Sequence, residues 1–274
     1  MPADFSYDPV TALDEAKATG EAAAIFADIR ETMSLPLVTS IWRGLAGMDD
    51  SLPRVWAATK PLFLSGLPES ALTRALSDAL LPRPEPLVPV QLSCIGLDGE
   101  DVQAIRTILA AYNRSNGMNL MALAALMSAP AQTRSAPAAA PPPSPKWPPL
   151  RPLAAREAIA DDVWEMVRHV NSFGAPGQDS AVATLWRHLA HWPALLALVY
   201  SAFTPLQSRG EIQAASARLA GLALAEGARM AHLRPARLDF PPLAVATIRN
   251  YVEDPMQVCR MVVLGHALEQ WLAP

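Results

Sequence analysis

Charged side chains are scarce in this sequence of 274 residues, at 18%, whereas apolar residues make up 51%. An average soluble protein has roughly 25% charged residues, and disordered chains have fewer apolar ones. The formal net charge of −4 leaves no basic surplus, which excludes the electrostatic attraction that non-specific nucleic-acid binding needs. We therefore expect a folded globular protein that does not bind nucleic acid.

Cysteine is rarer still, since the sequence has two, Cys94 and Cys259, and no Cys-x-x-Cys pair. This excludes a disulfide framework and a cysteine zinc or redox centre, and we interpret Cys259 as a core residue. The longest apolar stretch, residues 192–206, is interrupted by Pro193 and Pro205 and is too short to span about 30 Å of hydrocarbon. The N-terminus has no basic start and no apolar segment of a secretory signal. We expect a cytoplasmic protein without a membrane partner.

The sequence also lacks the motifs of the common enzyme classes, namely Gly-x-Ser-x-Gly, the P-loop, Gly-x-Gly-x-x-Gly and His-Glu-x-x-His. His188 and His191 lie three residues apart on an expected helix, where they either share a metal or are buried or interfacial histidines. No carboxylate lies between Asp179 and Glu211 to complete a metal site, which favours the second interpretation. We expect neither a metal nor an organic cofactor.

Proline marks the organisation of the chain. Nine of the 27 prolines fall between Pro130 and Pro152, in a stretch that predicts an extended linker rather than a helix or a strand. This linker, residues 130–153, separates two nearly equal parts, residues 1–129 and 154–274. Equal parts are typical of an internal duplication.

The two parts match at a constant offset of 144 residues. Residues 41–46 lie over residues 185–190, where Trp42-Arg43 corresponds to Trp186-Arg187, and residues 60–62 lie over residues 204–206. With a small deletion the match continues at Tyr112 and Tyr251. We predict two tandem pseudo-repeats, related by a pseudo-two-fold axis with a cleft between them.

Each half has the periodicity of helices. Asp8-Pro9 predicts the start of a helix that continues to about Met33, and residues 101–109 and 163–170 have apolar positions at i, i+3, i+4 and i+7. Residues 112–117 contain two asparagines and a glycine, which predicts a joint between two helices. No stretch alternates convincingly as a strand does, so the predicted fold class is all-α.

The paired tryptophans and arginines at matching positions indicate equivalent structural roles in the two repeats. We expect Trp42 and Trp186 in the core and Arg43 and Arg187 in solvent. The alternative is that either arginine turns inward, where its planar fork would bind a carboxylate.

Scattered residues along most of the chain resemble the group I 2-haloacid dehalogenases. They are Ile29-Arg30-Glu31-Thr32-Met33 with Pro36, Arg43 with Leu45-Ala46, Asn113 with Asn116, Leu189-Ala190 with Trp192-Pro193, and Tyr251. The resemblance implies an all-α protein of two tandem pseudo-repeats joined by a long linker. It also implies a small carboxylic acid as the ligand, and the apolar helices permit the homodimer that the family suggests.

The family's reaction is a direct displacement, in which an aspartate deprotonates the water that attacks the halogen-bearing carbon. Asn116 falls on the family's active-site asparagine, which helps to position water or substrate, and Tyr251 falls on its pocket tyrosine. Thr184 stands where the family has a serine. The resemblance therefore implies a retained pocket at these three residues.

Other positions of the implied pocket have changed. Leu185 occupies the position of the catalytic aspartate, and Leu37 and Ser40 replace two pocket aromatics. Asn119 replaces a further tyrosine. Leucine cannot accept a proton, so the resemblance implies the pocket but not its usual base.

Two functions follow. In the first, the chain is a hydrolase acting on the carbon–halide bond of 2-haloacids, and Asp179, or one of the acids Glu253 and Asp254, replaces the missing base. The alternative role of Asp179 is that of a helix N-cap. In the second, the chain is a non-catalytic small-carboxylate binder or a degenerate relative, because Leu185 cannot activate water.

Overall fold

The computed structural model describes residues 12–79, 81–82, 85–133, 145–175 and 182–272, and in these ranges every regular element is a helix. The all-α class expected from the sequence is confirmed. The longer helices are α1 (Gly20–Met33), α2 (Ser40–Ala46), α3 (Ser51–Leu64), α4 (Leu67–Ala79), α5 (Pro89–Cys94), α6 (Gly99–Met127), α7 (Asp161–Asn171), α8 (Thr184–His188), α9 (Pro193–Ser208), α10 (Glu211–Met230), α11 (Pro242–Glu253) and α12 (Arg260–Trp271). Short helical turns are η1 (Glu15–Lys17), η2 (Arg156–Ala158), η3 (Leu189–His191), η4 (Ala231–Leu233) and η5 (Pro255–Cys259).

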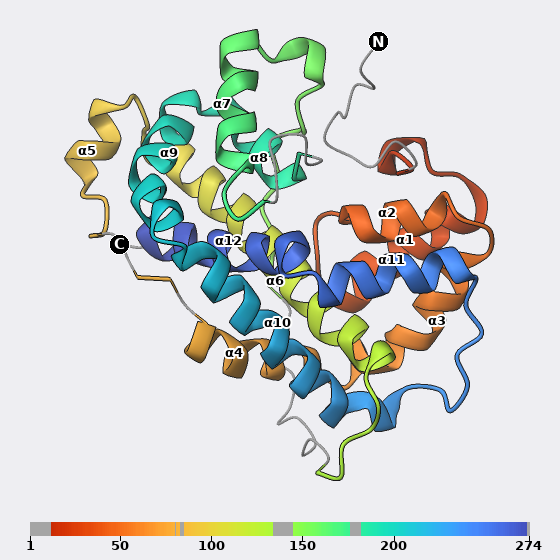
Figure 1. The fold of residues 1–274 in the computed structure, drawn as a ribbon. Helices are drawn as coiled ribbons and strands as arrows, with labels where there is room; N and C mark the ends of the chain where they lie inside the picture. Colours follow the sequence, from red (N-terminus) through yellow and green to blue (C-terminus); the bar gives the residue numbers. More distant parts are fainter. Residues whose placement is uncertain (1–11, 80, 83–84, 134–144, 176–181, 273–274) are drawn as a thin grey trace, which may run out of the picture.

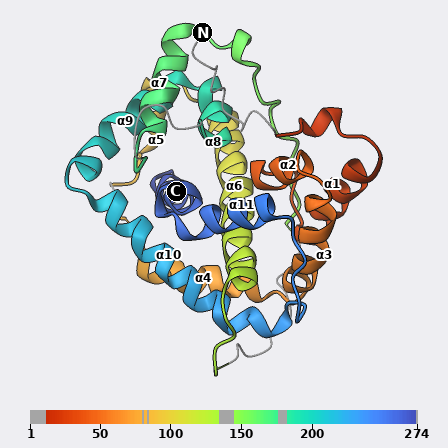
Figure 2. The ribbon, with the colours of Figure 1, turned by 45° about the vertical axis from the view of Figure 1, so that its right-hand side comes forward.

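Helix α6 runs through the middle of the molecule (Figures 1 and 2), and α3, α4, α10, α11 and α12 pack against it. Its C-terminal half is buried on all sides, from Met118 to Leu126. One hydrophobic core joins residues from both predicted repeats. None of the described helices combines the length and the apolarity of a membrane span.

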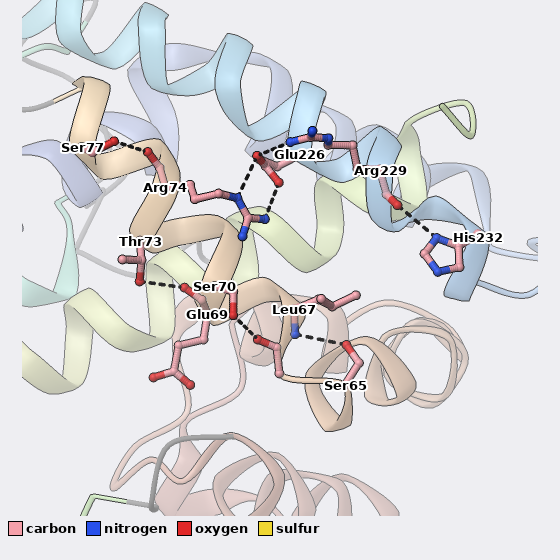
Figure 3. A network of polar contacts seen from close by, with 11 residues as sticks. Ser65, Leu67, Glu69, Ser70, Thr73, Arg74, Ser77, Glu226, Arg229 and His232 are labelled. Atoms are coloured by element: carbon pink, nitrogen blue, oxygen red, sulfur yellow. Dashed lines mark hydrogen bonds and ion pairs between the residues drawn. The ribbon is translucent and has the colours of Figure 1, made fainter. Parts of the chain in front are cut away.

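Helices α6 and α10 approach closely because Gly227 has no side chain. A Cβ atom at this position would lie 2.6 Å from the backbone carbon of Ala124. Next to the crossing, the buried Glu226 of α10 accepts hydrogen bonds from Arg74 of α4, at 3.2 and 2.7 Å, and from Arg229 at 3.2 Å (Figure 3). Burial by itself would raise the pKa of Glu226, but the two arginines together hold it below its ordinary value. The carboxylate therefore stays charged and joins α4 to α10.

The N-terminal helix is shorter than the sequence predicts. Asp8 and Pro9 lie outside the described residues, and α1 begins only at Gly20, after an extended Thr19. Hydrogen bonds to distant residues keep the preceding segment from joining α1. The backbone N–H of Leu13, for example, donates to the carbonyl of Arg43 at 3.0 Å. Glu15 in addition accepts hydrogen bonds from the α1 side chain Arg30 and from a backbone N–H.

The predicted joint at residues 112–117 is wrong, because α6 continues through it without a break. Two of the residues that suggested a turn contact other helices instead, and the third, Asn116, lines a cavity. Asn113 donates to Glu269 of α12 at 2.6 Å. Gly117 lies against Leu72 of α4, where an added Cβ would be 2.3 Å from the leucine Cδ2 atom. Tertiary contacts thus outweigh the local preference of asparagine and glycine for turns.

The two other helical predictions are confirmed. Helix α6 contains residues 101–109, and α7 contains residues 163–170 with Val167 and Val170 fully buried. Residues 193–208 form α9, whose buried side chains include Val199 and Phe203. The described parts of the linker, residues 130–133 and 145–153, contain no helix.

Candidate functional site

A cavity of about 320 Å³ lies where α2, α6, α8, α11 and α12 come together. Figure 2 shows α2, α8 and α11 around the middle of α6. Exposed Asn250 and Gln257 lie at its edge, and the buried Arg260 and Leu185 lie within its wall. The lining residues are Thr39, Ser40, Ile41, Gly44, Met48, Tyr112, Asn116, Val182, Ala183, Thr184, Leu185, Thr247, Asn250, Tyr251, Gln257, Val258, Arg260 and Met261.

Five of the residues that the sequence assigned to the site line this one cavity. They come from four different helices and are Ser40, Asn116, Thr184, Leu185 and Tyr251. Residues up to 211 positions apart in the chain, Ser40 and Tyr251, therefore meet in the fold, as a shared pocket requires.

Two predicted pocket residues are not among the lining residues. Leu37 is partly buried and packs against the core. Asn119 is fully buried in α6, where its carbonyl oxygen accepts from Trp42 Nε1 at 3.0 Å and its nitrogen donates to Thr39 Oγ1 at 2.9 Å. Because Thr39 lines the cavity, Asn119 supports the wall rather than forming it.

The candidate replacement bases are not in the described lining. Asp179 lies outside the described residues. Glu253 is exposed at the end of α11. Asp254 caps the following turn by accepting from the backbone N–H of Met256 at 2.9 Å. The described wall of the cavity therefore contains no Asp or Glu.

A break between α11 and α12 shapes one side of the cavity. Pro255 has no backbone N–H and cannot continue α11, and Gln257 has a non-helical conformation with φ −90° and ψ −117°. The chain therefore bends between α11 and α12, so that Tyr251 before the break and Arg260 after it line the same space.

Arg260 brings a cation into this wall, with 5% of its surface exposed. Its Nε donates to the carbonyl of Met256 at 2.7 Å, and its Nη1 donates to the carbonyls of Asn171 and Phe173 at 2.7 and 3.2 Å. Its Nη2 makes one longer bond of 3.4 Å, to Asn171 Oδ1. None of the described carboxylates forms an ion pair with it.

Burial lowers the pKa of Arg260 to about 10, a shift that the charge of Asp254 partly opposes. The guanidinium is thus still protonated at neutral pH. A buried charge without a partner of opposite sign is unfavourable, and a planar guanidinium matches a carboxylate. The site is therefore electrostatically suited to an anionic ligand.

The hydroxyl of Tyr251 is buried and has no hydrogen-bond partner in the described part of the chain. Asn119 lies beside it but is already bonded to Trp42 and Thr39. Burial raises the pKa of Tyr251, with a smaller contribution from Cys259, so the hydroxyl stays protonated. It can donate a hydrogen bond to a molecule in the cavity.

Cys259 itself is fully buried, and burial raises the pKa of its thiol to about 12. The interpretation of this residue as a core cysteine is confirmed. A thiol that stays protonated at neutral pH is a poor nucleophile.

The paired tryptophans are both in the core, as expected, with Trp42 and Trp186 fully buried. The expectation of solvated arginines is wrong for Arg43, which is buried at 7% exposure. Arg187 donates to the carbonyl of Ala154 at 2.6 Å. Neither arginine is among the residues that line the cavity.

His188 and His191 bind the end of the linker. The Nε2 atom of His188 donates to the carbonyl of Arg151 at 2.6 Å, and that of His191 donates to the carbonyl of Pro152 at 2.9 Å. Burial lowers the pKa of His188 to about 4, so it is neutral at physiological pH. They are therefore interfacial histidines, and no group of three metal-ligating side chains occurs in the described ranges.

Sequence reasoning missed Arg260. A usable signal was present, because this arginine stands alone in the otherwise apolar run Val-Cys-Arg-Met-Val-Val-Leu at residues 258–264. A single charge among buried positions must find partners, and such residues often belong to a site.

The chain is similar to known 2-haloacid dehalogenases in sequence and in fold. A configuration-inverting 2-haloacid dehalogenase of Alcaligenes xylosoxydans xylosoxydans is 28% identical over 115 residues, which is 42% of this chain and 39% of that protein. The match thus spans less than half of the relative's length. No protein-family model matches the chain.

Solved structures of D-2-haloacid dehalogenases have the same fold over almost the whole chain. A mutant in complex with D-2-CPA has a TM-score of 0.74 at 14% identity, covering 98% of this chain and 97% of that one. A further mutant structure has a TM-score of 0.76, with the same identity and coverage. A complex with L-LA has a TM-score of 0.74 at 14% identity, covering 98% of both chains. These matches confirm the resemblance that the sequence indicated.

Proposed function

We propose that this chain, a divergent relative of the 2-haloacid dehalogenases with their all-α fold, binds small 2-substituted carboxylic acids without displacing halide from them. One observation supports this most directly, namely that the described lining of the cavity includes the buried, positively charged Arg260 but no carboxylate. The cation supplies a place for the ligand's carboxylate, and Tyr251 supplies a hydrogen-bond donor.

The missing step is the activation of water. A general base must lie within hydrogen-bond reach of the water it deprotonates, or act through one further water. Leu185, at the position of the family's aspartate, is 2% exposed and has no group that accepts a proton. The polar side chains Asn116 and Thr184 can orient a ligand or a water, but at neutral pH neither is a base.

The cavity also supports the proposed division of the chain into repeats 1–129 and 154–274, joined by the linker. Its lining includes pairs at the offset read from the sequence, Ser40 with Thr184 and Ile41 with Leu185. Tyr112 and Tyr251 form a further pair. We propose that the cavity is the cleft between the repeats.

The test is chloride release from both enantiomers of 2-chloropropionate, with thermal-shift measurements in parallel. We expect no chloride above the protein-free control. Lactate and propionate should raise the melting temperature by on the order of 5 °C at a concentration of about a hundred times Kd. Propionamide, which has the same shape but no charge, should leave it unchanged. A shift with propionamide, or none with the acids, would contradict a carboxylate site.

One observation favours the alternative, a hydrolase with a relocated base. Val182 and Thr184 line the cavity directly after the segment that holds Asp179. Asp179 precedes Val182 by three positions in the sequence.

If the parent protein releases chloride, the variant Asp179→Asn tests whether Asp179 is the general base. Loss of a general base should lower the rate by about 10²–10⁴-fold. The matched control is Asp162→Asn, which removes an exposed carboxylate from the first turn of α7 and should leave the rate unchanged. An unchanged rate in Asp179→Asn would show that this residue is not the base.

A further inference from the structure

The cavity is larger than a three-carbon acid needs. Lactate has six non-hydrogen atoms, which fill roughly 180 Å³ even at the volume of about 30 Å³ that each molecule of liquid water occupies. The cavity measures about 320 Å³. A ligand that fills it has several more non-hydrogen atoms than lactate.

The extra space is bordered by apolar side chains rather than by charges. Arg260 is the one charged residue among the described lining. The apolar side chains come from both halves of the chain and are Ile41, Met48, Val182, Leu185, Val258 and Met261. The two methionines are flexible and adapt to ligands of different shapes.

The part of the cavity that lactate would leave unfilled includes a space beside Gly44, in the wall formed by α2. The residue is buried and lines the cavity, yet a Cβ atom built on it would meet no atom within 4 Å. Ile41 precedes it by three positions in α2, which places these two on one face of the helix, and Met48, two residues beyond the end of α2, also lines the cavity. Gly44 is thus a gap in an apolar wall, and the gap opens into the cavity.

We propose that the ligand is a 2-substituted carboxylic acid with an apolar side chain of about four carbons or more. The inference rests on the proposed function, because it takes the carboxylate to lie at Arg260. The side chain then lies against the wall of Ile41, Gly44 and Met48. Burial of each methylene group tightens binding by about fourfold.

The experiment is isothermal titration of the full-length protein with lactate, 2-hydroxyhexanoate and threonate. Threonate has the same number of non-hydrogen atoms as 2-hydroxyhexanoate but carries hydroxyl groups in place of the methylenes. We expect 2-hydroxyhexanoate to bind up to about sixtyfold more tightly than lactate, and threonate to gain nothing over lactate.

Two variants test whether the ligand's apolar side chain lies at Gly44. Gly44→Leu fills the gap, so 2-hydroxyhexanoate should bind to within about threefold of lactate in this variant. Gly44→Ala fills less of the gap, so more of the difference in affinity between 2-hydroxyhexanoate and lactate should remain. This variant keeps α2 well formed, because alanine favours a helix. If Gly44→Leu kept the full difference in affinity between 2-hydroxyhexanoate and lactate, the ligand's apolar side chain would not lie at Gly44.

The outcomes separate the two proposals. Equal binding of lactate and 2-hydroxyhexanoate, or tightest binding of threonate, would overturn the apolar side chain and leave the carboxylate site in place. If none of the three acids binds, the proposed function fails, and this inference fails with it.

Discussion

Gly227→Ala should lower the free energy of unfolding by about 1–3 kcal/mol, the usual cost of overpacking a core. The added Cβ would lie 2.6 Å from the backbone carbon of Ala124 and 2.9 Å from its oxygen. A backbone cannot rotate away as a side chain can, so α6 and α10 would have to separate. This contact joins the two halves of the chain, and Glu226 would shift with it relative to Arg74.

Urea unfolding measures this effect, and Gly221→Ala in the same helix is the matched control. Gly221 is exposed, and a Cβ atom there would meet nothing within 4 Å. Its replacement should stabilise the protein by about 0.5–1 kcal/mol, because alanine is the better helix former. If Gly227→Ala proved as stable as the parent, the close crossing of α6 and α10 would be wrong.

Arg260→Met should weaken the binding of the tightest acid by about 10–100-fold, since a hydrogen bond to a charged group contributes about 1.5–3 kcal/mol. Methionine fills a similar volume but offers no N–H group and no charge. Arg260→Lys should recover part of the affinity, because lysine keeps the charge but not the planar fork.

Isothermal titration measures the binding, and the melting temperature of each variant reports whether it is folded. Arg218→Met is the control for the loss of a positive charge, since Arg218 is exposed on α10 and donates to the carbonyl of Asp78. It should bind the acids as the parent does. Parent-like affinity in a folded Arg260→Met variant would show that the ligand's carboxylate lies elsewhere.

These variants test a site that could be predicted from the sequence only in part. Asn116, Thr184 and Tyr251 follow from the resemblance, and the structure brings them to one cavity. The same reasoning placed Leu37 and Asn119 in the lining, whereas they lie in the surrounding core. A resemblance aligns positions along the chain, but the packing of side chains decides which positions face the open space.

Arg260 illustrates the opposite case. The sequence shows an isolated charge in an apolar run, but it does not show which carbonyl groups hold the guanidinium. The carbonyls of Asn171 and Phe173 are nearly ninety positions away. Only the tertiary fold brings the carboxyl end of α7 and the residues after it to Arg260, so no local pattern could have identified this group as part of the cavity wall.

Local sequence patterns predict the helical class and several helices, because the 3.6-residue period of buried positions is a local property, as in α6 and α7. Tertiary structure decided where that pattern fails. It draws residues 12–19 out of the predicted helix through the contacts of Leu13 and Glu15, and it keeps α6 continuous by giving Asn113 and Gly117 partners on other helices. Local preferences are worth about 1 kcal/mol or less per residue. Buried contacts between distant parts of the chain are worth more, and they therefore set the final structure.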